Sequence, residues 1–227
     1  MATEVCDSNQ LANVAAQRIA TALRTAITAD GQASLALAGG TTPRGAYEEL
    51  AKISGIDWPR VSVYFGDERA VPPTHPDSNF RMADAALFSR VALPVDNIYR
   101  VQAELADRGA VARAYEALLP ERFSVMVLGI GEDGHTASLF PGSPALEERT
   151  RRFLPVTGPK PPPERFSVTP PVIEAAEQLI MLATGAGKAD AVARALRGPL
   201  DIARTPSALA RLGLWLLDPA AAAKLND

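Results

Sequence analysis

The sequence predicts an α/β fold with a mostly parallel β-sheet that helices cover on both faces. Three observations support this prediction. Short apolar runs typical of buried strands recur along the 227 residues, glycine-rich polar segments follow several of them, and amphipathic helical patterns lie between some of them. Strands that alternate with helices usually pair in parallel, because each crossover helix returns the chain to the same end of the sheet.

The chain begins with a predicted helix, a strand, a glycine-rich loop and a second helix. Residues 8–29 place apolar side chains three and four positions apart, which predicts an amphipathic helix capped by Ser8 or Asn9. Residues 33–38 are a short apolar run typical of a strand, followed by the segment GGTTP (39–43). Proline suits the first turn of a helix, so Pro43 should open the second one.

The same order recurs further along the chain. A strand at 61–65 leads into the charged segment GDER (66–69), and a helix follows at 77–88. A strand at 124–130 leads into GEDGH (131–135). Further strands are predicted at 153–156, 165–169, 178–183 and 213–217, and further helices at 104–119 and 187–196. The proline-rich stretch 159–163 should be a stiff surface connection within a single domain spanning residues 1–227.

Composition excludes several functional classes. With 47% hydrophobic and 22% charged residues the chain is typical of a globular protein, and a net charge of −3 argues against nucleic-acid binding. The single cysteine, Cys6, lies near an N-terminus that we expect to be frayed, and it excludes an intramolecular disulfide. No signal-like N-terminus or long apolar stretch occurs, so we expect a soluble, cytoplasmic protein without a membrane partner.

The glycine-rich segments should meet at one site, because ligands of parallel sheets bind at the carboxyl ends of the strands. The backbone N–H groups of Gly39, Gly40 and Thr41 suit a phosphate or sugar oxygen, although the segment could equally be a tight turn. It is not a Walker loop. Residues 129–134 match G-x-G-x-x-G, but Pro141 and the residues after it interrupt the long helix that a dinucleotide site requires.

His135 is the strongest catalytic candidate in the sequence. Asp133 lies two residues before it and could hold the imidazole in one tautomer, which leaves the other nitrogen to act as a base. A structural role is the alternative. The other histidine, His75, is interpreted as a loop residue, and with so few His and Cys ligands we expect no catalytic zinc.

Charged residues near the predicted strand ends complete the candidate site. Asp67 follows Gly66 at the end of a strand, where its side chain can point into a pocket. Arg69, Arg165 and Lys188 are cations near such ends, and two or three of them could hold a phosphate dianion. Taken singly, each cation could instead form a surface ion pair.

Six blocks of the sequence together resemble the 6-phosphogluconolactonase family. They are AGGTTP (38–43), YFGDER (64–69), DSN (77–79), GIGEDGHTASLFP (129–141), RFSVT (165–169) and GAGK (185–188). The resemblance spans about residues 8–218. It implies a three-layer α/β/α sandwich with a Rossmann-like central sheet, shared with glucosamine-6-phosphate deaminase. It also implies a cytosolic enzyme that hydrolyses 6-phospho-D-glucono-1,5-lactone in the pentose phosphate pathway without a required cofactor.

The resemblance also implies roles for the candidate residues. His135 would be the general base for water, with Asp133 helping to place it and Asp67 lining the sugar site. Arg69 would stabilise the oxyanion. Arg165 and Lys188, with backbone groups of Gly40 and Thr41, would bind the phosphate; the roles of the two arginines could be exchanged. We expect a monomer whose partner is the small sugar-phosphate lactone.

Two alternatives to a lactonase remain at this stage. A deaminase relative would carry a glutamate five residues after the histidine, where this chain has Phe140. A non-catalytic sugar-phosphate sensor would keep the pocket and lose the base, whereas His135 and Asp133 are both present.

Overall fold

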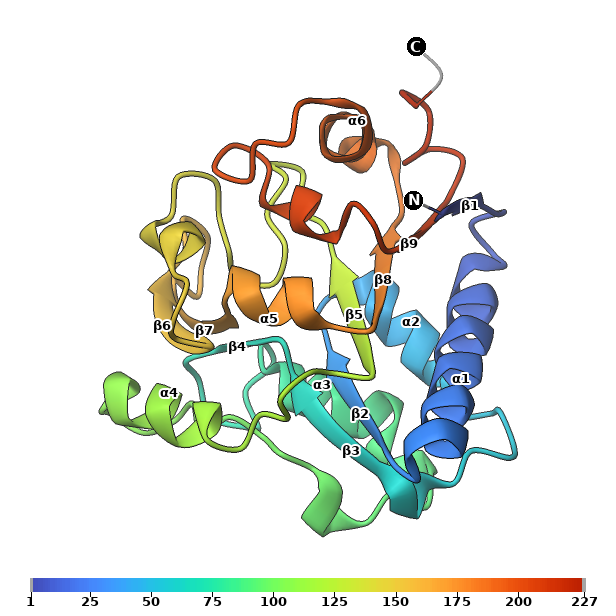
Figure 1. Ribbon diagram of the computed structural model, residues 1–227, viewed down its shortest axis with the longest axis vertical. Helices are drawn as coiled ribbons and strands as arrows, with labels where there is room; N and C mark the ends of the chain where they lie inside the picture. The colour runs from blue at the N-terminus through green and yellow to red at the C-terminus, as the bar shows by residue number, and fades with distance from the viewer. Residues whose placement is uncertain (1, 226–227) are drawn as a thin grey trace.

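The computed structural model describes residues 2–225 and contains two β-sheets (Figure 1). The larger sheet has six strands, and each neighbouring pair is parallel. Its strands, in spatial order, are β1 (Ala2–Val5), β9 (Leu214–Leu217), β8 (Gln178–Ala183), β5 (Val125–Gly129), β2 (Ala33–Leu37) and β3 (Val61–Phe65). The smaller sheet is antiparallel and contains β4 (Asp67–Arg69), β7 (Glu164–Val168) and β6 (Phe153–Thr157).

Helices cover both faces of the larger sheet, which confirms the predicted three-layer α/β/α arrangement. The helices are α1 (Leu11–Asp30), α2 (Thr41–Leu50), α3 (Asn79–Ala86), α4 (Arg108–Glu116), α5 (Pro170–Ala175) and α6 (Ala189–Arg197). In Figure 1, α1 and α2 lie to one side of the sheet, and α5 and the smaller sheet lie to the other. Within residues 2–225, no helix is both long enough and apolar enough to span a membrane.

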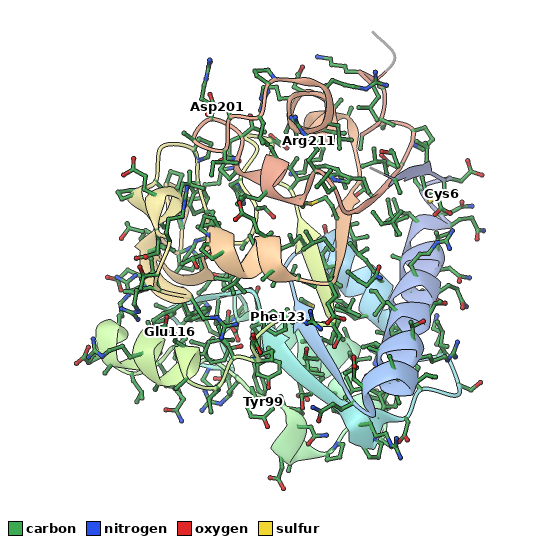
Figure 2. All side chains as sticks on the ribbon, in the orientation of Figure 1. Cys6, Tyr99, Glu116, Phe123, Asp201 and Arg211 are labelled. Atoms are coloured by element: carbon green, nitrogen blue, oxygen red, sulfur yellow. The ribbon has the colours of Figure 1, made fainter. Side chains whose placement is uncertain are left out.

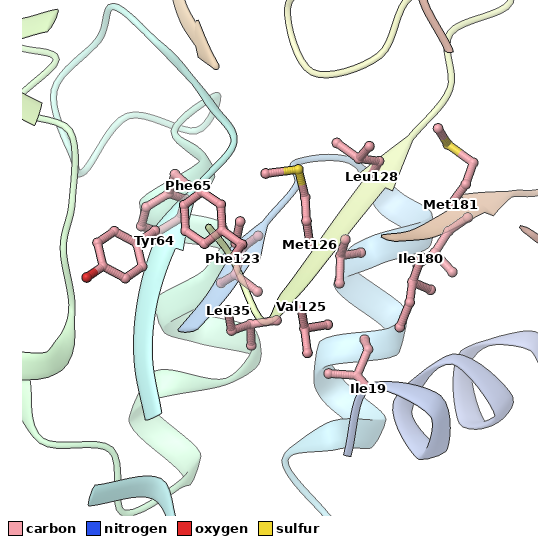
Figure 3. Close-up of a cluster of buried hydrophobic side chains, with 14 of the residues drawn as sticks. Ile19, Leu35, Tyr64, Phe65, Phe123, Val125, Met126, Leu128, Ile180 and Met181 are labelled. Atoms are coloured by element: carbon pink, nitrogen blue, oxygen red, sulfur yellow. The ribbon is translucent and has the colours of Figure 1, made fainter. Parts of the chain in front are cut away.

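Side chains of the central strands are buried on both faces of the sheet, which explains why these strands read as continuous apolar runs. Figure 3 shows Val125 and Ile180 on the side facing Ile19 of α1, while Met126 and Met181 point the other way. All five are at most 2% exposed. The buried hydrophobic cluster continues into the smaller sheet through residues such as Phe166. The single domain spanning residues 1–227 stays a prediction.

The smaller sheet differs from the sequence prediction in three segments, namely 153–156, 165–169 and the residues after Gly66. The predicted strands 153–156 and 165–169 form, but they pair antiparallel with each other as β6 and β7 rather than joining the parallel sheet. The segment after Gly66 is itself a strand, β4, and not a loop. Residues 159–163 connect β6 to β7, and all but the half-buried Pro162 are exposed, as expected for a surface connection.

The start of the first helix and the N-terminus of the chain differ from what we predicted. Helix α1 begins at Leu11 after Gln10, without a side-chain cap, and Ser8 instead donates its hydroxyl to Asp218 Oδ2 at 3.1 Å. Neither Ser8 nor Asn9 is therefore the cap. The N-terminus is not frayed at residues 2–5, because these residues pair with β9 and the Cys6 amide donates to the Leu217 carbonyl. Figure 2 shows Cys6 near the start of α1.

Two buried tyrosine hydroxyls hold the strand ends that lead to the glycine-rich and charged segments. Tyr47 on α2 accepts the Ala38 amide at 2.9 Å and donates to the Ala38 carbonyl. Tyr115 on α4 accepts the Phe65 amide at 2.7 Å and donates to the Phe65 carbonyl. Both rings are almost fully buried. Each hydroxyl thus bonds the backbone N–H and C=O of a residue at the end of a strand, just before the glycine-rich or charged segment begins.

We expect Tyr115→Phe to lower the free energy of unfolding by about 1–3 kcal/mol, because the buried Phe65 amide loses its acceptor. Urea unfolding followed by circular dichroism measures the change. The matched control is Tyr99→Phe, at a half-buried tyrosine, with an expected change within about 0.5 kcal/mol. Equal stability of Tyr115→Phe and the unaltered protein would contradict this account.

Candidate active site

The predicted segments converge on one cavity of about 180 Å³ at the carboxyl ends of the parallel strands. It is lined by Ala38, Gly39, Gly40, Asp67, Arg69, Gly129, Ile130, Gly131, His135, Ala137, Arg165 and Lys188. Larger surface hollows of about 630 and 430 Å³ are lined by no predicted site residue, and another of about 530 Å³ is lined by one of them, Asp133. Of the predicted residues, only Asp133 and Thr41 are absent from the cavity wall; Asp133 contacts His135, and Thr41 begins α2 beside Gly40.

The loop after β5 brings His135 and Asp133 together. His135 Nδ1 lies 2.6 Å from Asp133 Oδ1, and the same oxygen accepts the His135 backbone amide at 3.2 Å. The loop closes through the Gly131 amide, which donates to the His135 carbonyl. Because Asp133 is the partner of Nδ1, the imidazole carries its Nδ1 proton toward the carboxylate and keeps Nε2 as the basic nitrogen.

The surroundings of this pair keep the imidazole neutral. Burial lowers the pKa of His135 and outweighs the attraction of Asp133, which acts in the opposite direction. Burial alone would raise the pKa of Asp133, but His135 and Lys160 more than offset it, so that pKa is lowered. Asp133 is therefore a carboxylate and His135 a free base at neutral pH. Sequence reasoning missed Lys160, which lies in the segment treated only as a surface connection.

Asp67 is buried and already bonded. Ser138 donates its hydroxyl to Asp67 Oδ2 at 2.7 Å, and Asn79 donates its side-chain amide to Asp67 Oδ1 at 3.1 Å. Ser138 belongs to the same loop as His135, so these bonds tie the cavity wall to the loop that carries His135. Neither Ser138 nor Asn79 was among the predicted site residues, although both lie in the blocks that carry the family resemblance.

Glu68 is a buried residue next to Asp67, and it was also not among the predicted site residues. Only 2% of it is exposed. Its carboxylate accepts the backbone amides of Asn79, Phe80 and Arg69 at 2.8 to 2.9 Å and the Ser78 hydroxyl at 3.2 Å. Burial raises the pKa of Glu68 in spite of these bonds. The carboxylate thereby joins β4 to the N-terminus of α3.

Two arginines lie side by side on adjacent strands of the smaller sheet. Arg69 on β4 and Arg165 on β7 are directly paired in the register, so their side chains lie on the same face. Arg69 Nη1 donates to the Asp77 carbonyl at 2.6 Å, and its buried Nε has no hydrogen-bond partner among residues 2–225. Arg165 is 7% exposed, and burial lowers its pKa, with Arg69 adding to the effect and Asp67 opposing it.

The cavity holds positive charge that no protein carboxylate pairs with directly. Within residues 2–225, none of Arg69, Arg165 and Lys188 has a carboxylate within 4.0 Å. Lys188 follows Gly185 at the turn into α6, and Gly40 precedes the first residue of α2. Cations and a helix N-terminus around one cavity can hold a dianion. Across the described residues, no group of three or more His, Cys, Asp or Glu side chains is placed to hold a metal.

The parallel sheet, with its site at the strand ends, places the chain among the Rossmann-like α/β proteins. Residues 6–214 match the family described as Glucosamine-6-phosphate isomerases/6-phosphogluconolactonase. The chain is 38% identical over 236 residues to the 6-phosphogluconolactonase of Mycobacterium tuberculosis, with 96% of each chain covered. It is 39% identical to that of Streptomyces coelicolor, with 96% of this chain and 92% of the relative covered. The chain therefore belongs to the glucosamine-6-phosphate isomerase/6-phosphogluconolactonase family.

Solved structures agree with this assignment. The 6-phosphogluconolactonase of Trypanosoma brucei superposes with a TM-score of 0.86 at 29% identity, covering 99% of this chain and 98% of that one. A monomeric glucosamine-6-phosphate deaminase superposes with a TM-score of 0.87 at 22% identity, covering 99% of this chain and 100% of that one. At that identity the second likeness shows the shared fold alone.

We expect His135 to titrate below about pH 6.5, the ordinary value for histidine, because burial disfavours its charged form. NMR of the imidazole protons against pH measures the midpoint, and a His75→Gln variant assigns the two histidine signals. Asp133→Asn should lower the midpoint further, since it removes the negative charge that favours the imidazolium. A midpoint above 6.5 in the unaltered protein would refute the argument.

Proposed function

We propose that this chain hydrolyses 6-phospho-D-glucono-1,5-lactone to 6-phospho-D-gluconate in the pentose phosphate pathway, with His135 as the general base. The names of the relatives support lactone hydrolysis. The observation that carries the choice of base is the 2.6 Å contact between His135 Nδ1 and Asp133, at a cavity that also contains three cations. A neutral, oriented imidazole beside an anion-binding surface is what hydrolysis of a phosphorylated lactone requires.

In the first step His135 Nε2 takes a proton from a water molecule, and the water oxygen attacks C1 of the lactone. Asp133 stabilises the imidazolium that forms and keeps the ring oriented. The carbonyl oxygen becomes an oxyanion. In the second step the C1–O5 bond breaks, the carbonyl re-forms, and the proton held by His135 passes to the leaving ring oxygen. One water is consumed and an open-chain carboxylic acid results.

The cations divide between the reacting centre and the phosphate. We assign the oxyanion to Arg69, and the 6-phosphate to Arg165, Lys188 and the backbone N–H groups of Gly39, Gly40 and Thr41. A single well-placed donor to an oxyanion contributes about 10²–10³ in rate. Because Arg69 and Arg165 are neighbours across two strands, an exchange of their roles is the competing assignment, which single substitutions distinguish. Asp67, bonded to Ser138 and Asn79, shapes the sugar site.

The environment of His135 argues against the two alternatives. At the position of the deaminase glutamate this chain has Phe140, and its ring centroid lies 4.6 Å from that of the imidazole. A phenyl ring cannot transfer a proton, so it cannot assist ring opening. A sensor would not require a neutral base bonded to a half-buried carboxylate. We therefore propose hydrolysis rather than deamination or ligand sensing, with no cofactor and no catalytic metal.

We also propose that the protein acts as a monomer in the cytoplasm. The most exposed large apolar side chains are Val5, Val95, Leu105, Leu118, Leu200 and Leu212. They come from separate segments, and single exposed apolar residues are normal on monomeric proteins. A single half-buried cysteine suits a reducing compartment.

We expect His135→Ala to lower kcat by about 10²-fold or more while the protein stays folded, because a positioned general base contributes about 10²–10⁴. A pH-stat assay on freshly made lactone, with the spontaneous rate subtracted, measures the loss. His75→Ala is the matched control and should keep full activity. A folded His135→Ala variant with near-normal turnover would exclude His135 as the base.

We expect Arg165→Ala and Lys188→Ala to raise KM for the phosphorylated lactone far more than for unphosphorylated glucono-1,5-lactone. The reason is that each loses a charge-assisted contact to the phosphate. The ratio of kcat/KM on the two lactones measures the effect. Lys52→Ala, at an exposed lysine paired with Glu49, is the control. An equal loss on both lactones would remove the residue from the phosphate site, and for Arg165 it would favour the oxyanion role.

A further inference from the structure

We propose that Phe140 is a positioning residue, which fixes the imidazole of His135 and the guanidinium of Arg165 relative to each other by contacting both. This inference rests on the proposed function, since it concerns the base and a phosphate ligand of that site. Phe140 does not line the cavity, so it acts through its two neighbours and not on the substrate.

The Phe140 ring touches both groups. Its centroid is 4.6 Å from that of the His135 imidazole, with the two planes tilted by 39°. The guanidinium carbon of Arg165 lies over the same ring, 5.5 Å from its centroid. Contacts of these kinds are directional, because the ring has an electron-rich face and an electron-poor edge. One rigid side chain thus sets the spacing of two groups that lie thirty residues apart in the sequence.

Phe140 is itself immobilised. It is 4% exposed, and the chain passes so closely at Gly158 that a Cβ there would lie 2.6 Å from Phe140 Cε2 and 3.3 Å from Arg165 Nε. The Gly158 amide donates to the Pro163 carbonyl, which closes the β6–β7 connection over the ring. Glycine at position 158 therefore provides the space that the ring and the guanidinium occupy.

The remaining bonds leave one nitrogen on each group for the substrate. Asp133 engages His135 Nδ1, while the carbonyls of Pro162 and Lys160 accept Arg165 Nε at 2.9 Å and Nη2 at 3.3 Å. In the described part of the chain, no protein group bonds His135 Nε2 or Arg165 Nη1. Phe140 therefore sets the distance between the nitrogen that activates water and the nitrogen that contacts the phosphate.

The test compares two substitutions that disturb this arrangement in different ways. Phe140→Leu removes the ring, and Gly158→Ala keeps the ring but forces it to shift, together with the Arg165 guanidinium beside it. We expect each to lower kcat/KM on the phosphorylated lactone by about 10- to 100-fold, the scale of a misplacement of about 1 Å. Gly45→Ala on α2, where a Cβ would meet only Ala12 Cβ at 3.6 Å, is the control and should keep full activity.

Two readouts separate positioning from general damage to the fold. Phe140→Leu exposes the imidazole to water, so the acidic limb of the kcat/KM profile should move to higher pH, toward the ordinary histidine value. Phe140→Leu should also cost less in an Arg165→Ala background than in the unaltered protein, because one of its two targets is gone. Both readouts are taken on variants whose thermal unfolding is cooperative, and Gly158→Ala decides the question if Phe140→Leu does not fold.

The proposal is overturned if Phe140→Leu keeps normal kcat/KM and an unmoved acidic limb, or if Gly158→Ala keeps normal kcat/KM. It is also overturned if the loss is the same with and without Arg165. These results are distinct from failure of the proposed function. Normal activity of His135→Ala would refute the general base whatever Phe140 does, whereas an inactive His135→Ala beside a normal Phe140→Leu would refute only this inference.

Discussion

The site depends on two consecutive buried carboxylates, Asp67 and Glu68, at the point where the chain leaves the parallel sheet and enters the smaller one. A buried carboxylate is costly unless hydrogen bonds replace its water, and here donors from three segments do so. Glu68 receives three backbone amides and a hydroxyl, two of the amides from the first turn of α3, whose dipole also favours negative charge. Asp67 receives Asn79 and Ser138.

This hydrogen-bond network positions Arg69 and the loop that carries His135. Because Glu68 fixes β4, the side chain of Arg69 is directed to the same face as Arg165 on β7. Because Asp67 accepts the Ser138 hydroxyl, the loop that carries His135 is tied to the opposite wall of the cavity. The buried carboxylates are therefore bonded by amide and hydroxyl donors of the protein, and the nearby cations remain available to a ligand. A chain of net charge −3 can in this way present a local positive site to a phosphorylated substrate.

Sequence reasoning predicted the elements whose signal is local. Apolar runs located β2, β3, β5, β8 and β9 within about one residue, and the polar segments behind them did meet at one cavity. The antiparallel sheet could not be predicted, since β4 is a charged segment of three residues and the orientation of β6 and β7 depends on their partners. Glu68 and Asn79 were missed because their roles arise from contacts ten to twelve positions apart, which no spacing pattern reveals.

Two glycines of the site, Gly39 and Gly131, make close contacts that the sequence alone does not reveal. At Gly39, where the anion-binding role stays a prediction, glycine is also required by packing, because a Cβ there would lie 2.0 Å from Asn79 Oδ1. Likewise a Cβ at Gly131 would lie 2.0 Å from His135 Nδ1 and 2.4 Å from Asp133 Oδ1. These glycines make room for the protein's own polar side chains, which contact one another there and hold Asp67 and His135 in place. A glycine-rich strand end in this fold therefore marks a densely packed site, where polar side chains lie close against the backbone, as well as a place where the backbone can approach a ligand.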